Sequence, residues 1–314
     1  VCTPICPLTS LPSVRETYSY KLLHGPDLAL VTDSVKHCFD FIKGFKVLLN
    51  LFSSETVPAT LKKVLSSIEQ IIHKEQFKIV ENHQSCDELS NAQKLKLAHF
   101  IRYGFKHSML DLVVLYAKID AWYGMAMAVK KYDLVFPQFV QNNDPVIETK
   151  GLYHLLVQEP VAYDVMLNQK TNFLFLTGAN MAGKSTFIKS VGAAVFLAHV
   201  GMGVPAIEMK LTLFDGLLSN INVSDNITKG ESYFYNEVHR IKNTIIKLSD
   251  GKKWLILIDE LFKGTNVQDA MKCSSTVIEG LLKIRNSLFI LSTHLYEIGE
   301  GLKKYSNIDF KYFE

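Results

Sequence analysis

The chain has 314 residues, of which 48% are hydrophobic and 21% charged, which excludes a disordered or collagen-like protein and suggests two globular domains. Its 34 Lys and Arg residues nearly balance its 31 Asp and Glu residues, so binding of polyanions by bulk charge alone is also excluded. The five cysteines form no C-x-x-C pair, which favours reduced thiols and a cytoplasmic protein. The most apolar windows, Leu112 to Val129 and Val191 to Ile207, are interrupted by charged residues or glycines, so we expect no membrane span.

The first half of the chain is predicted to be mostly helical. From Asp33 to Lys74 and from Asn91 to Tyr132, apolar residues recur at spacings of three and four, which is the pattern of amphipathic helices. Ser90 is suited to cap the second stretch. That stretch is long enough for a stiff rod that transmits motion, but a plain core helix explains the pattern equally well.

The pattern changes after a segment from Phe136 to Pro145, where two prolines and Asn142-Asn143-Asp144 break the helix. We therefore place a domain boundary there, with a helical region at residues 1–140 and a second domain at residues 141–314. Short apolar runs then alternate with helical stretches, which predicts an α/β domain with a mainly parallel sheet. The predicted strands are 173–177, 254–258 and 287–292, and the predicted helices are 185–199, 237–248 and 268–284.

A glycine-rich loop is the strongest motif in the sequence. It follows the first of these strands and opens a helix, in the pattern G-x-x-x-x-G-K-[ST], and it consists of Gly178-Ala179-Asn180-Met181-Ala182-Gly183-Lys184-Ser185. Glycines let successive backbone N–H groups face a phosphate, and the helix adds its positive N-terminal end. Lys184 would place a charge on the β- and γ-phosphates of ATP, and the Ser185 hydroxyl would bind Mg²⁺.

Two acidic residues end the next apolar strand, where parallel strands present ligand-binding groups. Asp259 is placed to hold the Mg²⁺ shell, and Glu260 to polarise or deprotonate the water that attacks the γ-phosphate. A further strand runs into His294, which we expect at the same edge as a sensor of the γ-phosphate. Acidic residues and histidines are common at the ends of strands that meet solvent. We interpret Asp259, Glu260 and His294 as catalytic because the phosphate loop is present in the same domain.

These motifs resemble those of the MutS-type ATPases, a branch of the ABC ATPases associated with DNA mismatch repair and recombination. The resemblance lies in Thr177 to Thr186, with Asn180-Met181 inside the loop, in Ile258 to Leu261, and in Ser292-Thr293-His294. It implies an α/β P-loop ATPase domain of the ABC type, preceded by a mostly helical core and lever domain. The ATPase domain is expected to be incomplete at its C-terminal end.

The resemblance also implies partners and further site residues. Ser232, in a segment that looks like the family's signature loop, would reach the γ-phosphate bound by a second subunit of a homodimer. Val161 would pack against the adenine, and Thr186 would complete the phosphate loop. Opening and closing of the dimer would then move the helical arms on DNA. Phe262-Lys263 replaces the usual Gly-Arg after the acidic pair.

Two functions remain open at this point. The residues before the ATPase domain are too few for a mismatch-reading domain together with a complete clamp and lever, so the DNA structure that is bound stays undefined. The alternative is a nucleotide-gated structural or adaptor ATPase that acts on a protein partner without binding DNA, which the near-neutral charge favours slightly.

Overall fold

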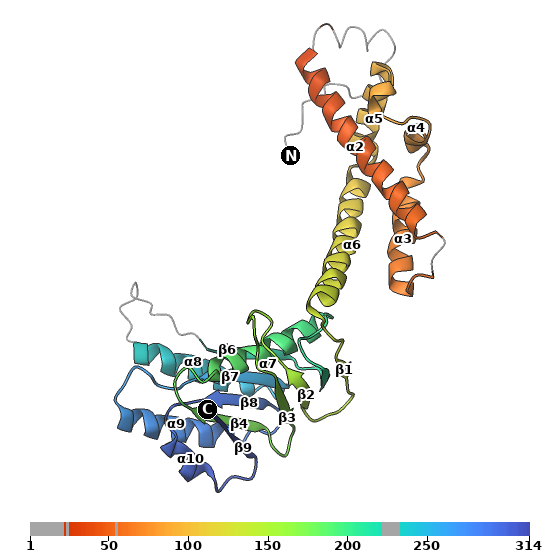
Figure 1. The fold of residues 1–314 in the computed structure, drawn as a ribbon. Coiled ribbons are helices and arrows are strands. Elements are labelled where there is room, and N and C mark those ends of the chain that lie inside the picture. Colours follow the sequence, from red (N-terminus) through yellow and green to blue (C-terminus); the bar gives the residue numbers. More distant parts are fainter. Residues whose placement is uncertain (1–21, 23–24, 54–55, 222–232) are drawn as a thin grey trace. The chain divides into compact units, whose positions relative to one another are not determined.

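The computed structural model describes residue 22 and residues 25–53, 56–221 and 233–314 (Figure 1). These residues belong to two compact units, Val1–Tyr123 and Gly124–Glu314. The first unit is helical, and the second contains both β-sheets of the described chain. The chain therefore has a helical part and an α/β part with a parallel sheet, in the order expected from the sequence.

The two units divide inside one helix, α6 (Lys106–Tyr132). The end of this helix contacts the α/β unit, since the Tyr153 hydroxyl donates a 2.9 Å hydrogen bond to the backbone carbonyl of Tyr132. Gly203 of the α/β unit packs closely against Val129 of α6, because a β-carbon built on Gly203 would be 3.0 Å from Val129 Cγ2. Compactness thus assigns the end of α6 to the α/β unit, and the domain boundary expected at 140/141 stays a prediction.

The helical unit is built from short and long helices that share one core. Its elements are α2 (Gly25–Leu51), α3 (Ala59–Ile72), η1 (Glu75–Phe77), α4 (Lys78–Glu81), η2 (Cys86–Glu88), α5 (Asn91–His99) and η3 (Phe100–Gly104), followed by α6. One face of α2 is buried at the three- and four-residue spacing of an amphipathic helix, from Leu28 through Val35 to Phe45. Burial in this core raises the pKa of the Cys38 thiol to about 12, so this thiol is neutral at physiological pH.

The rod expected over residues 91–132 is interrupted. Ser90 does cap α5 in a capping box with Gln93, as its position suggested. After α5 ends at His99, residues Phe100–Gly104 form a π-helical turn, η3, and α6 begins only at Lys106. Phe105 explains the break, because its fully buried ring packs 4.6 Å from the ring of Phe77 and 5.4 Å from that of Phe100. The π-helical turn ends at Gly104, and Phe105, with a φ of −128°, separates it from α6.

Helix α6 is long and apolar enough to cross a membrane by length and composition, and 6% of its most apolar window is buried. Among the described residues it is the one helix with this property. Such a helix is weak evidence for a membrane protein, because core helices of soluble proteins have the same composition. The absence of a membrane span thus stays a prediction.

The α/β unit contains two sheets. A five-stranded parallel sheet has the order β6-β7-β8-β4-β9, and a four-stranded mixed sheet has the order β1-β5-β2-β3. The strands of the parallel sheet are β4 (Phe173–Gly178), β6 (Gly216–Asn220), β7 (Trp254–Asp259), β8 (Leu288–Ser292) and β9 (Ile308–Phe313). Those of the mixed sheet are β1 (Gln138–Phe139), β2 (Ile147–Leu152), β3 (Tyr163–Leu167) and β5 (Glu208–Leu211).

Both faces of the parallel sheet are covered, which explains why its central strands are apolar throughout. Along β4, Leu174 and Leu176 belong to a core shared with α7 (Lys184–His199) and the mixed sheet. Phe173 and Phe175 point to the other core, which contains residues of the remaining helices. These helices are α8 (Tyr233–Leu248), α9 (Val267–Leu281) and α10 (Glu297–Leu302). The strands predicted at 173–177, 254–258 and 287–292 are confirmed as β4, β7 and β8.

Candidate nucleotide site

The phosphate loop predicted from the sequence connects β4 to α7, so its context is the expected strand–loop–helix. Gly183 precedes the helix with a φ of 94°, and Gly178 ends the strand with a φ of 140°. A β-carbon on Gly178 would lie 2.1 Å from the backbone oxygen of Phe313 in β9, so no larger residue fits there. Asn180 and the fully exposed Met181 form the tip of the loop, and Met181 has a φ of 66°.

Lys184 is held inside the loop. Its Nζ donates hydrogen bonds of 2.8 Å to the Gly178 carbonyl and 2.7 Å to the Ala179 carbonyl, and its side chain is buried. Lys184 is also the first residue of α7, where the helix presents its unpaired backbone N–H groups. Ser185 follows as a half-buried residue and Thr186 as an exposed one. Positive charge and N–H donors are therefore concentrated at this end of the helix, which suits an anion such as phosphate.

Asp259 ends β7 and is nearly buried, with 9% of its surface exposed. The fully buried Ser292, at the end of β8, donates a 2.5 Å hydrogen bond from Oγ to Asp259 Oδ1. This bond orients the carboxylate through Oδ1, in the way that hydrogen bonds to metal-binding carboxylates orient them. The backbone links three strands at this point, because Thr293 N–H donates to the Leu176 carbonyl of β4 at 2.9 Å.

Glu260 follows with a φ of 63°, a conformation that is uncommon for a residue with a side chain. Its backbone N–H donates a 3.0 Å hydrogen bond to the Ser292 carbonyl, which ties it to β8. Its carboxylate lies between two basic groups: Lys263 Nζ is 3.0 Å from Oε2, and His294 Nδ1 is 3.7 Å from Oε1. The structure therefore brings the predicted residues Asp259, Glu260 and His294 together at the carboxyl ends of β7 and β8.

Two partners of these acids were missed in the sequence. Lys263 lies three residues after Glu260 in a loop, where the spacing rule for charged pairs on helices does not apply, so the sequence did not indicate this pair. The contact of Ser292 with Asp259 depends on which strands are neighbours, and it carries no local signal. Ser232, which the resemblance placed in the site, lies outside the described residues.

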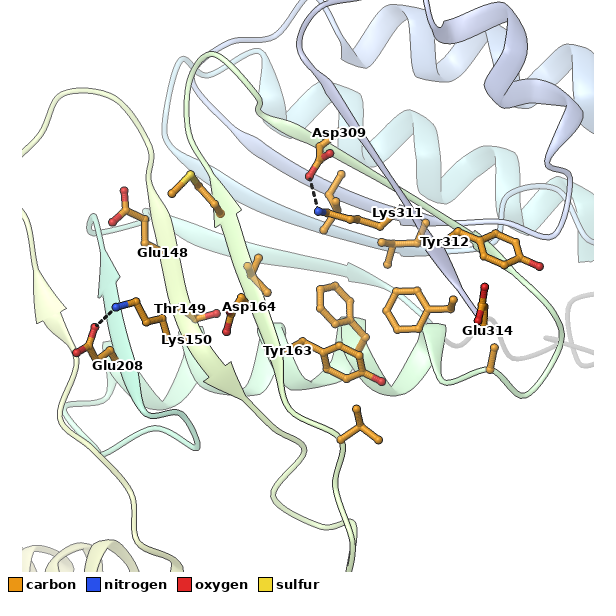
Figure 2. A pocket seen from close by; sticks show the side chains of 18 of the residues that line it. Glu148, Thr149, Lys150, Tyr163, Asp164, Glu208, Asp309, Lys311, Tyr312 and Glu314 are labelled. Carbon is orange, nitrogen blue, oxygen red and sulfur yellow. Dashed lines mark ion pairs between the residues drawn. The ribbon is translucent and has the colours of Figure 1, made fainter.

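A cavity of about 890 Å³ lies beside the loop. Figure 2 shows side chains of β2, β3 and β5 on one side of it and those of β9 on the other. Ala182 of the phosphate loop and Val161, which is 66% exposed, both line the cavity, so the predicted adenine contact is adjacent to the loop. Lys184 and the acidic pair are not among the lining residues.

Two ion pairs lie in the cavity wall. Lys150 Nζ lies 3.2 Å from Glu208 Oε2, and Lys311 Nζ lies 3.7 Å from Asp309 Oδ2, as the dashed lines in Figure 2 mark. The Tyr163 ring of β3 and the Phe313 ring of β9 pack 5.4 Å apart where the two sides of the cavity meet. The cavity thus combines apolar surface with a few polar groups, as small-molecule sites usually do.

The residues of the site suit Mg²⁺ and a nucleotide phosphate. Within the described part of the chain no cluster of three or more His, Cys, Asp or Glu side chains forms a metal cage. Mg²⁺ bound with a nucleotide needs no such cage, because it is held by one or two carboxylates, phosphate oxygens and water. The Ser185 hydroxyl and the Asp259 carboxylate are oxygen donors of the kind it prefers.

Comparison with known proteins agrees with this geometry. MutS domain V matches residues 174–313, which cover the phosphate loop, the acidic pair and β9. The DNA mismatch repair protein MutS of Thermotoga maritima is 30% identical over 255 residues, 79% of this chain and 29% of that protein. MutS of Petrotoga mobilis is 26% identical over 81% of this chain and 30% of its own length. MutS of Lactococcus lactis is 30% identical over 62% of this chain and 23% of its own length.

Fold and comparisons together define an α/β domain that is similar to MutS domain V and is joined to a helical region. The comparisons support a MutS-family member that covers only a partial region of its relatives. It spans less than a third of the length of these curated relatives.

Proposed function

We propose that this chain binds ATP with Mg²⁺ and hydrolyses it at the loop from Gly178 to Thr186. The placement of Lys184 carries the proposal. This lysine is buried at the N-terminus of α7, and its Nζ donates hydrogen bonds of 2.8 and 2.7 Å to the carbonyls of Gly178 and Ala179. A phosphate offers this ammonium group a negatively charged acceptor, so nucleotide binding would replace hydrogen bonds to neutral carbonyls with bonds between opposite charges.

The proposed binding residues would contact three different parts of the ligand: the phosphates, the metal ion and the adenine. The backbone N–H groups between Gly178 and Gly183 would surround the phosphates, and Lys184 would neutralise the β- and γ-phosphate oxygens. Ser185 and Asp259 would hold the metal, with Asp259 kept in orientation by Ser292. Bound Mg²⁺ supplies charge neutralisation at the phosphates. Val161 would pack against the adenine in the cavity that it shares with Ala182.

Glu260 would orient and polarise the attacking water. Its exposed fraction is 21%, so the carboxylate is reachable from solvent while its backbone is tied to β8. His294, with half of its side chain exposed, lies beside it and would contact the γ-phosphate. Both groups lie at the carboxyl edge of the parallel sheet, where ligands bind in open α/β folds.

The site would be completed in a homodimer, in which Ser232 of a second subunit reaches the γ-phosphate. Movement of the two ATPase domains would then displace the helical regions on DNA. The relatives named above are DNA mismatch repair proteins, which supports DNA as the partner. The shared ATPase domain and the resemblance of the loop around Ser232 support the dimer.

The test combines nucleotide turnover with DNA binding by the 314-residue chain. We expect phosphate release from ATP that needs Mg²⁺ and stops on addition of EDTA. Labelled perfect duplex, mismatched duplex, four-way junction and single strand should then show binding that depends on ATP and weakens with salt. No binding or hydrolysis of ATP would contradict the proposal. Hydrolysis without binding of any DNA at low salt would instead favour an adaptor ATPase with a protein target.

A further inference from the structure

The loop that follows Glu260 is anchored to helix α8 by a buried carboxylate. Glu237 on α8 is 5% exposed, and both of its oxygens accept hydrogen bonds from consecutive backbone N–H groups. Lys263 N–H donates to Oε1 at 3.1 Å, and Gly264 N–H donates to Oε2 at 3.2 Å. A carboxylate bound by two amides in this way is strongly stabilised in one position, because both bonds are charge-assisted.

The same face of α8 holds the loop through an apolar contact. Phe234 lies three residues before Glu237, so the two side chains project from neighbouring positions on the helix. The Phe234 ring packs 5.7 Å from the ring of Phe262, which is 4% exposed. Phe262 has a φ of 56°, which is strained for an aromatic residue and persists only where the surroundings hold it.

Lys263 connects this anchor to the acidic pair. Its backbone is bound by Glu237, while its ammonium group lies 3.0 Å from Glu260 Oε2. A displacement of α8 would therefore move the backbone of Lys263 and, through its side chain, the carboxylate of Glu260. The path consists of the hydrogen bond from the Lys263 N–H to Glu237 and the ion pair between Lys263 and Glu260. The Lys263 side chain is the one part of it that can change its conformation freely.

We propose that Glu237 is a positioning residue that sets the orientation of Glu260 according to the position of α8. This inference rests on the proposed ATPase function, because the consequence of moving Glu260 is a change in hydrolysis. The hydrogen bonds that the structure gives Glu237 come from Lys263 and Gly264 and not from the phosphate loop, so it controls turnover and leaves ATP affinity unchanged. Lys263 is the intermediate between the two carboxylates.

The decisive variant is Glu237→Gln, which keeps the shape of the side chain but removes its charge and one of its two acceptor oxygens. We expect kcat to fall about tenfold to hundredfold while KM for ATP changes less than about twofold. Amide hydrogen exchange of Lys263 and Gly264 should accelerate by roughly ten- to hundredfold, with the loop at 178–183 unchanged. Glu297→Gln, which alters an exposed glutamate of α10, is the control and should change neither quantity.

A double-mutant cycle separates positioning from general stabilisation. Lys263→Met should also lower kcat, and combining it with Glu237→Gln should add little, since both changes break the same path. Fully additive losses, or a fall in kcat matched by a rise in KM, would overturn the proposal. Exchange rates need no turnover, so they remain informative if the chain proves not to hydrolyse ATP. Unchanged exchange at Lys263 and Gly264 would overturn the inference by itself.

Discussion

Lys184 follows the loop at the carboxyl end of β4, and Glu260 follows the carboxyl end of β7 in the same sheet, but the contacts of the two side chains differ. Lys184 is buried and bonded only to backbone carbonyls in the hydrogen bonds that the structure gives it, whereas Glu260 is partly exposed and paired with two basic side chains. In the proposed mechanism, Lys184 serves ground-state binding of the phosphates and Glu260 serves the attack of water. Substitutions at the two positions should therefore affect different steps.

We expect Lys184→Ala to weaken ATP binding, because it removes the cation that faces the phosphates. Glu260→Gln should keep ATP affinity within a few-fold and slow hydrolysis by roughly two or more orders of magnitude. Equilibrium binding of a fluorescent ATP analogue and single-turnover phosphate release measure the two effects separately. Equal affinity and equal turnover in both variants would refute these roles.

Residues of the site differ in how far the sequence could reveal them. The phosphate loop and Asp259-Glu260 were predictable, since each is a local pattern at the end of an apolar strand. The hydrogen bond from Ser292 to Asp259 was not, because it joins residues from two strands whose pairing the sequence does not encode locally. The positive φ of Phe262 is likewise a result of tertiary packing.

At the scale of elements, the parallel sheet was the predictable part. Its central strands are continuous apolar runs, and its helices have clear three- and four-residue periodicity. The mixed sheet was missed because β1 has two residues and β2 contains the polar stretch Glu148-Thr149-Lys150. The π-turn at Phe100–Gly104 was missed because the apolar residues around it continue the pattern of a helix.

The aromatic cluster beneath that π-turn makes a testable contribution to the helical unit. Phe105→Ala should lower the free energy of unfolding by about 3–5 kcal/mol, since it removes a fully buried ring that contacts Phe77 and Phe100. Urea titration followed by far-ultraviolet circular dichroism measures the change. Phe136→Ala, at a residue that is 69% exposed, is the matched control and should cost less than about 1 kcal/mol. Similar losses for both variants would contradict the predicted contribution of this cluster to stability.

At the scale of the whole molecule, the proposed composite site predicts activity that depends on association. Turnover per chain should rise with protein concentration until the dimer is saturated. Ser232→Ala and Lys184→Ala should each be inactive alone. An equimolar mixture should recover about a quarter of the wild-type activity, because half of the dimers are mixed and each mixed dimer has one complete site. A rate independent of concentration, or no recovery on mixing, would contradict a shared site.

The strand order of the parallel sheet also determines when the nucleotide site can form. Within that sheet β4 pairs only with β8 and β9, whose residues come more than a hundred positions later in the chain. During synthesis, the strand that carries the phosphate loop thus remains without a partner in this sheet until residues 288–313 have left the ribosome. Two unpaired edges of an apolar strand are exposed for that time, and such edges favour aggregation. Assembly of the site is therefore a late folding event that depends on contacts distant in sequence.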